Sequence, residues 1–292
     1  MSDAQAVSVL GMGRMGAEMA RTLRREGFDV CVFNRTHAKA AAVAEETGAH
    51  LAETATEAAA GSPIVISILA DDASVESVWT EAAPGLTPGS VVLEMSTIDP
   101  STLLVIQPAI ERAGATLLDA PVSGSVQLVE QGALTIMVGG DATGLETARP
   151  VLEALGNNIF HLGELGSGAT IKLAVNSMIH SINIALSEAL VLAEKAGVDR
   201  KRAYEVFATS AASAPYVHYK RAAFEEPETA TVAFDLDLVA KDLDLILGLG
   251  ERVGAPLTQG AVNREVVGRA IAAGMGNDDL SAIATYLRRS SE

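Results

Sequence analysis

The sequence predicts an α/β fold in two parts: a doubly wound, mostly parallel sheet over residues 1–164, and an all-helical part over residues 165–292. Short apolar runs alternate with amphipathic stretches in the first part, which is the pattern of consecutive βαβ units. After about residue 165 only helix-period patterns remain. A long helix that begins near Gly168 is expected to join the two domains.

The expected strands are the apolar runs AVSVL, DVCVF, IVISIL, SVVLEM, ATLLDA, LTIMVGG and NIFHL. The stretches between most of them predict helices over residues 15–26, 39–47, 74–80, 101–113 and 144–155. In the second domain, helices are expected over residues 169–196, 200–210, 235–253 and 258–273.

The composition describes a globular protein and argues against several partners. With 292 residues, 49% of them hydrophobic, the chain can form two domains with substantial cores. A net charge of -16 argues against nucleic acid and anionic membranes as partners. No uninterrupted apolar stretch reaches about 18 residues and the N-terminus lacks a basic segment, so neither a membrane span nor a signal peptide is expected. The single cysteine fits a cytoplasmic protein, and the five histidines show no metal-site spacing.

A glycine motif follows the first strand. Gly11, Gly13 and Gly16 form G-x-G-x-x-G in "VSVLGMGRMGAEMARTL". Gly11 permits a tight turn, Gly13 lets the backbone approach a pyrophosphate, and Gly16 lets the helix pack close to the sheet. The helix N-terminus then offers N–H groups to the phosphates. The motif predicts a dinucleotide cofactor held by the loop that also contains Met12, Arg14 and Met15.

The end of the second strand bears on the choice of cofactor. A carboxylate there would bind the ribose 2′-hydroxyl of NAD, but the chain has Asn34, Arg35 and Thr36 and no acid. Because Arg35 can neutralise a 2′-phosphate, we expect NADP rather than NAD. A solvated arginine at a helix start would leave this preference open.

Two further loops are expected at the carboxyl ends of strands, where doubly wound folds bind ligands. One begins at Leu69 and Ala70, and the other contains Ser96 and Thr97. Their backbone and hydroxyl groups are candidates for the cofactor site. The acids of these loops, Asp71, Asp72 and Asp99, are expected to be helix caps.

Polar residues follow one face of the long helix. Lys172, Asn176, His180, Asn183 and Ser187 share that face at about 3.6 residues per turn. Spacing alone favours a partly exposed lysine, with the polar stripe facing solvent or a water-filled seam, and a satisfied structural His180. Spacing alone likewise favours a charge cluster within one helix for Lys241 and Asp242.

Several segments together resemble the β-hydroxyacid dehydrogenase family. They are GMGRMGAEMARTL, MSTIDP, LDAPVSGSVQLVEQGALTIMVGG, GSGATIKLAVN and KDLDL, in this order along the chain. The resemblance implies a Rossmann-type domain followed by an all-helical domain, assembled as a homodimer or homotetramer. It also implies hydride transfer between NADP and a small 3-hydroxy acid or carboxylate-bearing aldehyde, so that the substrate is a small anion.

The resemblance also assigns roles to individual residues. Lys172 matches the catalytic lysine, and Asn176 the asparagine that assists it. Lys241 matches a lysine near the nicotinamide and the substrate. The turn that binds the substrate carboxylate matches Ser123 and Gly124, and Ser125 and Asp242 complete the expected substrate-binding set.

The chain departs from the family pattern at Ser125, Val129 and Val175. Ser125 and Val129 can reshape the pocket, which bears on the substrate more than on the chemistry. Two alternatives stay open. Imine reductases share the architecture but usually have Asp or Tyr in place of the lysine, and non-catalytic cofactor-binding relatives usually lose it. Lys172 favours a carbonyl or alcohol enzyme over an imine reductase, and the Lys172–Asn176 pair argues against a non-catalytic protein.

Overall fold

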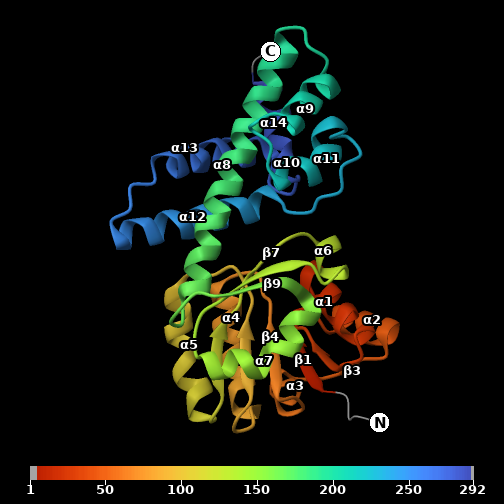
Figure 1. Ribbon diagram of the computed structural model, residues 1–292, viewed down its shortest axis with the longest axis vertical. Helices are drawn as coiled ribbons and strands as arrows, with labels where there is room; N and C mark the ends of the chain where they lie inside the picture. Colours follow the sequence, from red (N-terminus) through yellow and green to blue (C-terminus); the bar gives the residue numbers. More distant parts are fainter. Residues whose placement is uncertain (1–4, 291–292) are drawn as a thin grey trace. The chain divides into compact units, whose positions relative to one another are not determined.

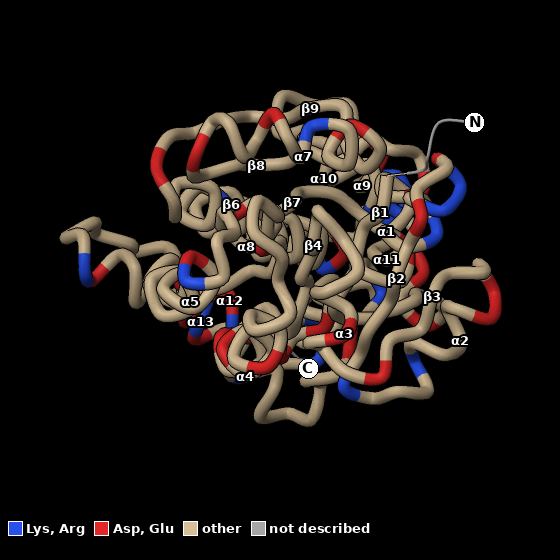
Figure 2. The backbone as a smooth tube through the Cα atoms, turned by 90° about the horizontal axis from the view of Figure 1, so that it is seen from below, with Lys and Arg blue, Asp and Glu red and all other residues tan. Residues whose placement is uncertain are grey.

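The structure, a computed structural model, describes residues 5–290. Its internal contacts divide the chain into two units, residues 1–172 and 173–292. Figure 1 shows a layered α/β arrangement for the first unit and helices for the second. Charged residues are distributed along the chain: Figure 2 shows Asp and Glu on many segments, so the negative charge is not confined to one element.

A six-stranded parallel sheet forms the centre of the first unit. Its order is β3-β2-β1-β4-β5-β6, the doubly wound order of dinucleotide-binding folds, which confirms the predicted class. The strands are β1 (Ala6–Leu10), β2 (Asp29–Phe33), β3 (His50–Leu51), β4 (Ile64–Ser67), β5 (Val91–Glu94) and β6 (Thr116–Asp119).

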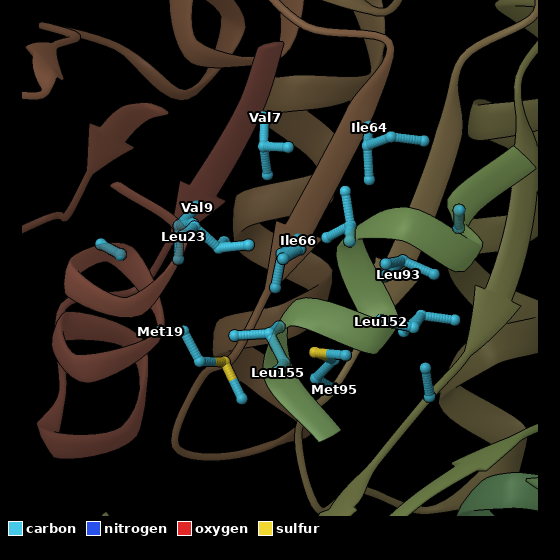
Figure 3. Packing of buried hydrophobic residues seen from close by; sticks show 14 of the residues in the cluster. Val7, Val9, Met19, Leu23, Ile64, Ile66, Leu93, Met95, Leu152 and Leu155 are labelled. Carbon is cyan, nitrogen blue, oxygen red and sulfur yellow. The ribbon is translucent and has the colours of Figure 1, made fainter. Parts of the chain in front are cut away.

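Helices cover both faces of this sheet. Side chains alternate between the faces along each strand, so each face has its own apolar core. Figure 3 shows one core, in which strand residues such as Val9 and Ile66 pack against Leu23 and Leu155 of two covering helices. The other core includes Trp79. The helices are α1 (Arg14–Arg25), α2 (His37–Thr47), α3 (Ala55–Ala60), α4 (Asp72–Ala82), η1 (Ala83–Gly85), α5 (Pro100–Arg112), α6 (Val126–Glu130) and α7 (Ala142–Leu155).

The last two predicted strands form, but they do not join the large sheet. They are β8 (Leu134–Val138) and β9 (Gly156–His161), and with β7 (Val122–Ser123) they make a second sheet in the order β7-β8-β9. The chain turns after β7 at Gly124, where φ is 148°. It returns through α6 so that β8 runs antiparallel to β7. This reversal places β7, β8 and β9 in a sheet of their own.

The second unit is helical, as predicted. The segment from 173 to 290 contains one isolated bridge, Asp235 with Asp279, and no strand. Its core includes Leu190, Tyr204 and Leu243. The helices are α9 (Arg200–Thr209), α10 (Pro215–Tyr219), α11 (Arg221–Glu225), α12 (Leu236–Val253), α13 (Thr258–Ala270), η2 (Ile271–Met275), η3 (Leu280–Ala282) and α14 (Ile283–Arg289).

Helix α8 (Ser167–Lys195) begins in the first unit and ends in the second. By length and composition alone it could cross a membrane, but the core helix of a soluble protein meets the same test, so this is weak evidence. Its polar stripe was expected to face solvent, and that expectation was wrong. From Asn176 to Ser187 the stripe residues are at most 6% exposed.

Hydrogen bonds satisfy part of the buried stripe, whereas the two ring nitrogens of His180 are buried without a hydrogen-bond partner among residues 5–290, so the expectation of a satisfied His180 was wrong. Asn183 donates to the carbonyl of Leu280 at 2.9 Å and accepts from the Tyr216 hydroxyl at 2.6 Å. Ser187 donates to the carbonyl of Asn183 at 2.7 Å. Polar groups can be buried when such bonds replace those to water, so these two residues belong to the core.

Candidate active site

The glycine loop leaves no room for side chains where strand and helix meet. Gly11 has a φ of 108°, and a Cβ there would lie 2.2 Å from the carbonyl oxygen of Ile68. A Cβ on Gly16 would lie 1.9 Å from the carbonyl oxygen of Gly11. Both positions therefore require glycine on steric grounds, and the loop is held tightly against the sheet.

Gly13 differs, because a Cβ added there would meet nothing within 4 Å. It caps α1 without a side-chain hydrogen bond, and the first turn of α1 contains no acid. The result is an open helix N-terminus with N–H groups that suit a pyrophosphate. Met12 is buried and Met15 packs against the core, whereas Arg14 is exposed. A dinucleotide fits this loop.

The loop after β2 is connected to the glycine loop. Asn34 accepts from the backbone N–H of Met12 at 2.9 Å and donates to the carbonyl of Thr36 at 3.0 Å. The side-chain amide of Asn34 therefore connects the loop after β2 to the glycine loop. Arg35 and Thr36 are exposed at the start of α2, and Thr36 makes no side-chain capping bond.

A buried carboxyl group ties together the loops after β4 and β5. Glu94 accepts from the backbone N–H of Ser96 at 2.8 Å, from the indole of Trp79 at 3.2 Å and from the hydroxyl of Ser67. The hydroxyl oxygen of Ser96 accepts in turn from the backbone N–H of Leu69 at 2.7 Å. Burial raises the pKa of Glu94. Ala70 is exposed in the first loop and Thr97 half-buried in the second.

The acids of these two loops are structural. Asp71 caps α4 and Asp99 caps α5, as expected. Asp72 is not a cap: its Oδ1 accepts from the backbone N–H of Asp99 at 2.8 Å and from the hydroxyl of Thr102. It therefore links the starts of the two helices.

The turn expected to bind the substrate carboxylate follows β7. A Cβ on Gly124 would lie 2.7 Å from the side chain of Leu134, so this position is closed to larger residues. Ser123 and Ser125 flank it half-buried. Val129, one of the departures from the family pattern, is buried, and its carbonyl accepts from the hydroxyl of Thr22 on α1 at 3.2 Å. The turn is thereby connected to the helix of the glycine motif.

In the second unit, Asp242 lies at the centre of a buried polar cluster. Its Oδ2 accepts from Nδ2 of Asn176 at 2.7 Å and lies 3.8 Å from Nε2 of His180. Its Oδ1 lies 3.0 Å from Nζ of Lys241. Lys241 and Asp242 are thus part of a cluster that joins α12 to α8, whereas spacing alone favoured a cluster within one helix.

Neighbouring groups in this cluster offset the effect of burial on the pKa of Asp242. Burial of Asp242 disfavours its ionised form, but His180 and Lys241 outweigh this, and the pKa lies below its ordinary value. At 3.8 Å from Oδ2 of Asp242, Nε2 of His180 is too distant for a hydrogen bond. Lys172, the remaining candidate, lies half-buried near the N-terminus of α8, one turn before Asn176.

Sequence reasoning missed two buried acids, Glu94 and Asp119. Each ends an apolar strand run, and a carboxyl group at the buried end of a strand must find partners. An acid at the end of an apolar strand run was therefore the feature of the sequence that could have identified both residues. Among residues 5–290, no group of three or more His, Cys, Asp or Glu could hold a metal ion.

The fold and the glycine loop define a dinucleotide-binding protein with a separate helical domain. Residues 6–163 match the NAD binding domain of 6-phosphogluconate dehydrogenase. Residues 166–287 match the NAD-binding domain of NADP-dependent 3-hydroxyisobutyrate dehydrogenase. The chain belongs to the β-hydroxyacid dehydrogenase family.

Individual relatives agree with this assignment. Glyoxylate/succinic semialdehyde reductase 2 of Arabidopsis thaliana is 34% identical over 97% of this chain and 79% of its own length. The structure of 3-hydroxyisobutyrate dehydrogenase from Mycobacterium tuberculosis with L-serine has a TM-score of 0.86 at 30% identity, over 98% of this chain and 99% of that one. An imine reductase from Pseudomonas sp. reaches 0.68 at 25% identity, over 98% of this chain and all of its own. The chain is an NAD(P)-dependent oxidoreductase of the hydroxyacid dehydrogenase type.

Proposed function

We propose that the protein reversibly reduces a small carboxylate-bearing aldehyde or keto acid to its hydroxy acid with NADPH, and that Lys172 is the general acid and base. The observation that carries this proposal is the position of the half-buried Lys172 on α8, one turn before Asn176, whose amide donates to Asp242. An ammonium beside an oriented amide is suited to proton transfer at a carbonyl oxygen.

The bound nicotinamide supplies or accepts the hydride. In reduction, the ammonium of Lys172 polarises the carbonyl group and then protonates the alkoxide oxygen, which leaves a neutral lysine. In oxidation, the neutral amine takes the hydroxyl proton. Because the NH2 group of Asn176 donates to Asp242, its amide oxygen is the atom suited to hold the lysine.

Substrate binding is assigned to the turn after β7. The hydroxyl of Ser123 and the backbone N–H of Gly124 are donors suited to a carboxylate, which would fix the carbonyl carbon for reaction. Lys241 adds positive charge to a protein of net charge -16. A small anion is therefore the proposed substrate class, and the relative that reduces glyoxylate or succinic semialdehyde by its name supports this choice.

The preference for NADP rests on the loop after β2. Arg35 is exposed at the position that recognises the adenosine ribose in doubly wound folds, and no acid occupies the end of that strand. A guanidinium group can bind a 2′-phosphate through two hydrogen bonds, whereas a carboxylate would repel it.

The test is Lys172→Ala in a steady-state assay with glyoxylate, succinic semialdehyde and 3-hydroxyisobutyrate. We expect kcat to fall by about 10²-fold or more, on the scale of general acid–base catalysis, while NADPH still binds. Retained turnover would remove Lys172 from the mechanism. A cyclic imine in the same panel tests the alternative function. If the protein reduces the imine but turns over none of the carboxylate substrates, it is an imine reductase.

A further inference from the structure

The carboxylate of Asp119 joins the end of β6 to the start of α8. Its Oδ1 accepts from the backbone N–H of Gly166 at 2.7 Å, and its Oδ2 accepts from the backbone N–H of Ala169 at 2.7 Å. Asp119 is 1% exposed. One oxygen therefore binds the residue before α8 and the other binds the first turn of α8, the helix that carries Lys172.

The surrounding backbone is shaped to this carboxylate. A Cβ on Gly139 would lie 2.4 Å from Oδ1 of Asp119, and a Cβ on Gly168 would lie 2.9 Å from Oδ2. The backbone of Asp119 also exchanges two hydrogen bonds with Gly139, at 3.2 and 2.8 Å. Glycine at both positions therefore leaves room for the carboxylate where it accepts from the start of α8.

The electrostatics of the helix start agree with this role. Burial raises the pKa of Asp119, and the N–H groups of Gly166 and Ala169 oppose that rise by stabilising the ionised form. An anion at a helix N-terminus also interacts favourably with the helix dipole. Two N–H groups that point at one carboxyl group require an acceptor at both oxygens.

Asp119 is also close in sequence to the turn after β7. Only Ala120, Pro121 and Val122 separate it from Ser123, and the backbone N–H of Met137 in the neighbouring strand β8 donates to the carbonyl of Pro121 at 3.0 Å. One residue thus connects the segment that leads to Ser123 with the helix start that leads to Lys172.

We propose that Asp119 is a positioning residue that fixes Lys172 relative to the Ser123–Gly124 turn. This inference rests on the proposed function, because it needs Lys172 to be the acid and base. The carboxylate of Asp119 is bonded to the backbone of Gly166 and Ala169, so the role proposed for it needs no contact with the substrate. It acts by setting the origin and direction of α8, and a displacement on the order of 1 Å at a catalytic group can cost about 10²-fold in rate.

The experiment compares Asp119→Asn with Asp141→Asn. The asparagine at 119 keeps the size of the side chain but turns an NH2 group toward one of the two N–H donors. Asp141 caps α7 by accepting from the N–H of Gly144 at 2.8 Å, so it is a matched loss of a helix cap in the same unit. We expect kcat of Asp119→Asn to fall by about tenfold to 10²-fold with the Kd for NADPH within twofold of wild type. Asp141→Asn should leave both values unchanged.

The outcomes separate this inference from the proposed function. An inactive Lys172→Ala together with a fully active Asp119→Asn would overturn the role of Asp119 alone. An active Lys172→Ala would overturn the proposed function itself. If NADPH affinity falls together with kcat in Asp119→Asn, the substitution damages the first unit as a whole, and the positioning role would also be overturned.

A second variant covers the case in which Asp119→Asn does not fold. In Asp119→Ser the side chain is smaller than that of aspartate and cannot collide with Gly139 or Gly168. Its hydroxyl oxygen keeps one acceptor for the N–H groups at the start of α8. This variant should also have a lowered kcat and an unchanged affinity for NADPH. A kcat equal to that of wild type in this variant would overturn the inference.

Discussion

The side-chain amide of Asn176 donates to the carboxylate of Asp242 at 2.7 Å, and the two residues are 6% and 0% exposed. Asp242 thus orients the amide beside which Lys172 is proposed to work. The neighbouring Lys241 and His180 keep the pKa of Asp242 below its ordinary value, although burial opposes this. Asp242 is therefore an anion near neutral pH, and Asn176 has a fixed acceptor.

Replacing Asp242 with Asn should lower kcat by about tenfold, since the amide of Asn176 would lose its anionic partner and could rotate. Steady-state kinetics with a carboxylate aldehyde measures the effect. Asp244→Asn is the matched control, because Asp244 lies on the same helix with its side chain 58% exposed and paired with Arg264. Equal kcat values for the two variants would contradict a role for Asp242.

Arg35 should determine the choice between NADPH and NADH. We expect kcat/KM to be higher with NADPH, and Arg35→Ala to lower it by about tenfold or more with NADPH, on the scale of a charge-assisted hydrogen bond. With NADH the variant should change little, since no 2′-phosphate is present. Arg149→Ala, an exposed arginine on α7 that pairs with Glu146, is the control. A preference of the wild type for NADH would reverse our interpretation of the loop after β2.

Gly13 and Gly16 should respond differently to the same substitution. Gly13→Ala places its methyl group in open space, at a φ of -72° that alanine adopts readily, so the melting temperature should not change. The methyl group would nevertheless occupy the approach to the pyrophosphate, and the Kd for NADPH should rise by about tenfold or more.

Gly16→Ala is the steric counterpart, because its Cβ would lie 1.9 Å from the carbonyl oxygen of Gly11. We expect it to lower the melting temperature as well as NADPH affinity. Thermal denaturation and NADPH fluorescence titration separate the two effects. A Gly13→Ala variant with wild-type affinity would show that no phosphate approaches this backbone.

The features predicted correctly from the sequence are those encoded locally. Alternating apolar runs and the glycine spacing determine the doubly wound sheet, because each βαβ unit buries its own apolar faces. The candidate residues in the loops after β1, β2, β4 and β5 follow the carboxyl ends of parallel strands, where the sequence predicted these loops. The second sheet was missed for a related reason: its antiparallel start depends on a turn at Gly124 rather than on periodicity.

The polar stripe of α8 shows what a single sequence does not encode locally. Whether Asn183 faces water or the core depends on Tyr216 and Leu280, which are distant in sequence. The same holds for Asp119, whose partners lie at the start of α8. Partners that come from other elements become visible only when the fold places them, and for this reason spacing alone favoured a solvated stripe.

The buried ion pair of Lys220 and Asp279 should matter more for stability than for catalysis. Nζ of Lys220 lies 2.8 and 2.7 Å from the two carboxylate oxygens, which also accept from the backbone N–H of Ala233 at 2.9 Å and the hydroxyl of Ser281 at 2.8 Å. Asp279→Asn leaves the ammonium buried without its counter-charge, so the free energy of unfolding should fall by about 3 kcal/mol. Urea denaturation at neutral pH measures this loss, and a variant with an unchanged midpoint would contradict it.

The pH dependence of that loss has a definite sign. Burial alone would raise the pKa of Asp279, but the ammonium of Lys220 and the backbone donors outweigh it, and the pKa lies below its ordinary value. The stabilisation is therefore present above the unfolded pKa of about 3.9 and is lost as the pH falls through the lower folded value. The difference in unfolding free energy between wild type and Asp279→Asn should shrink as the pH falls below about 4. Lys201→Ala, which removes an exposed pair with Glu226, should leave the urea midpoint unchanged at every pH, because an exposed ion pair is screened by solvent.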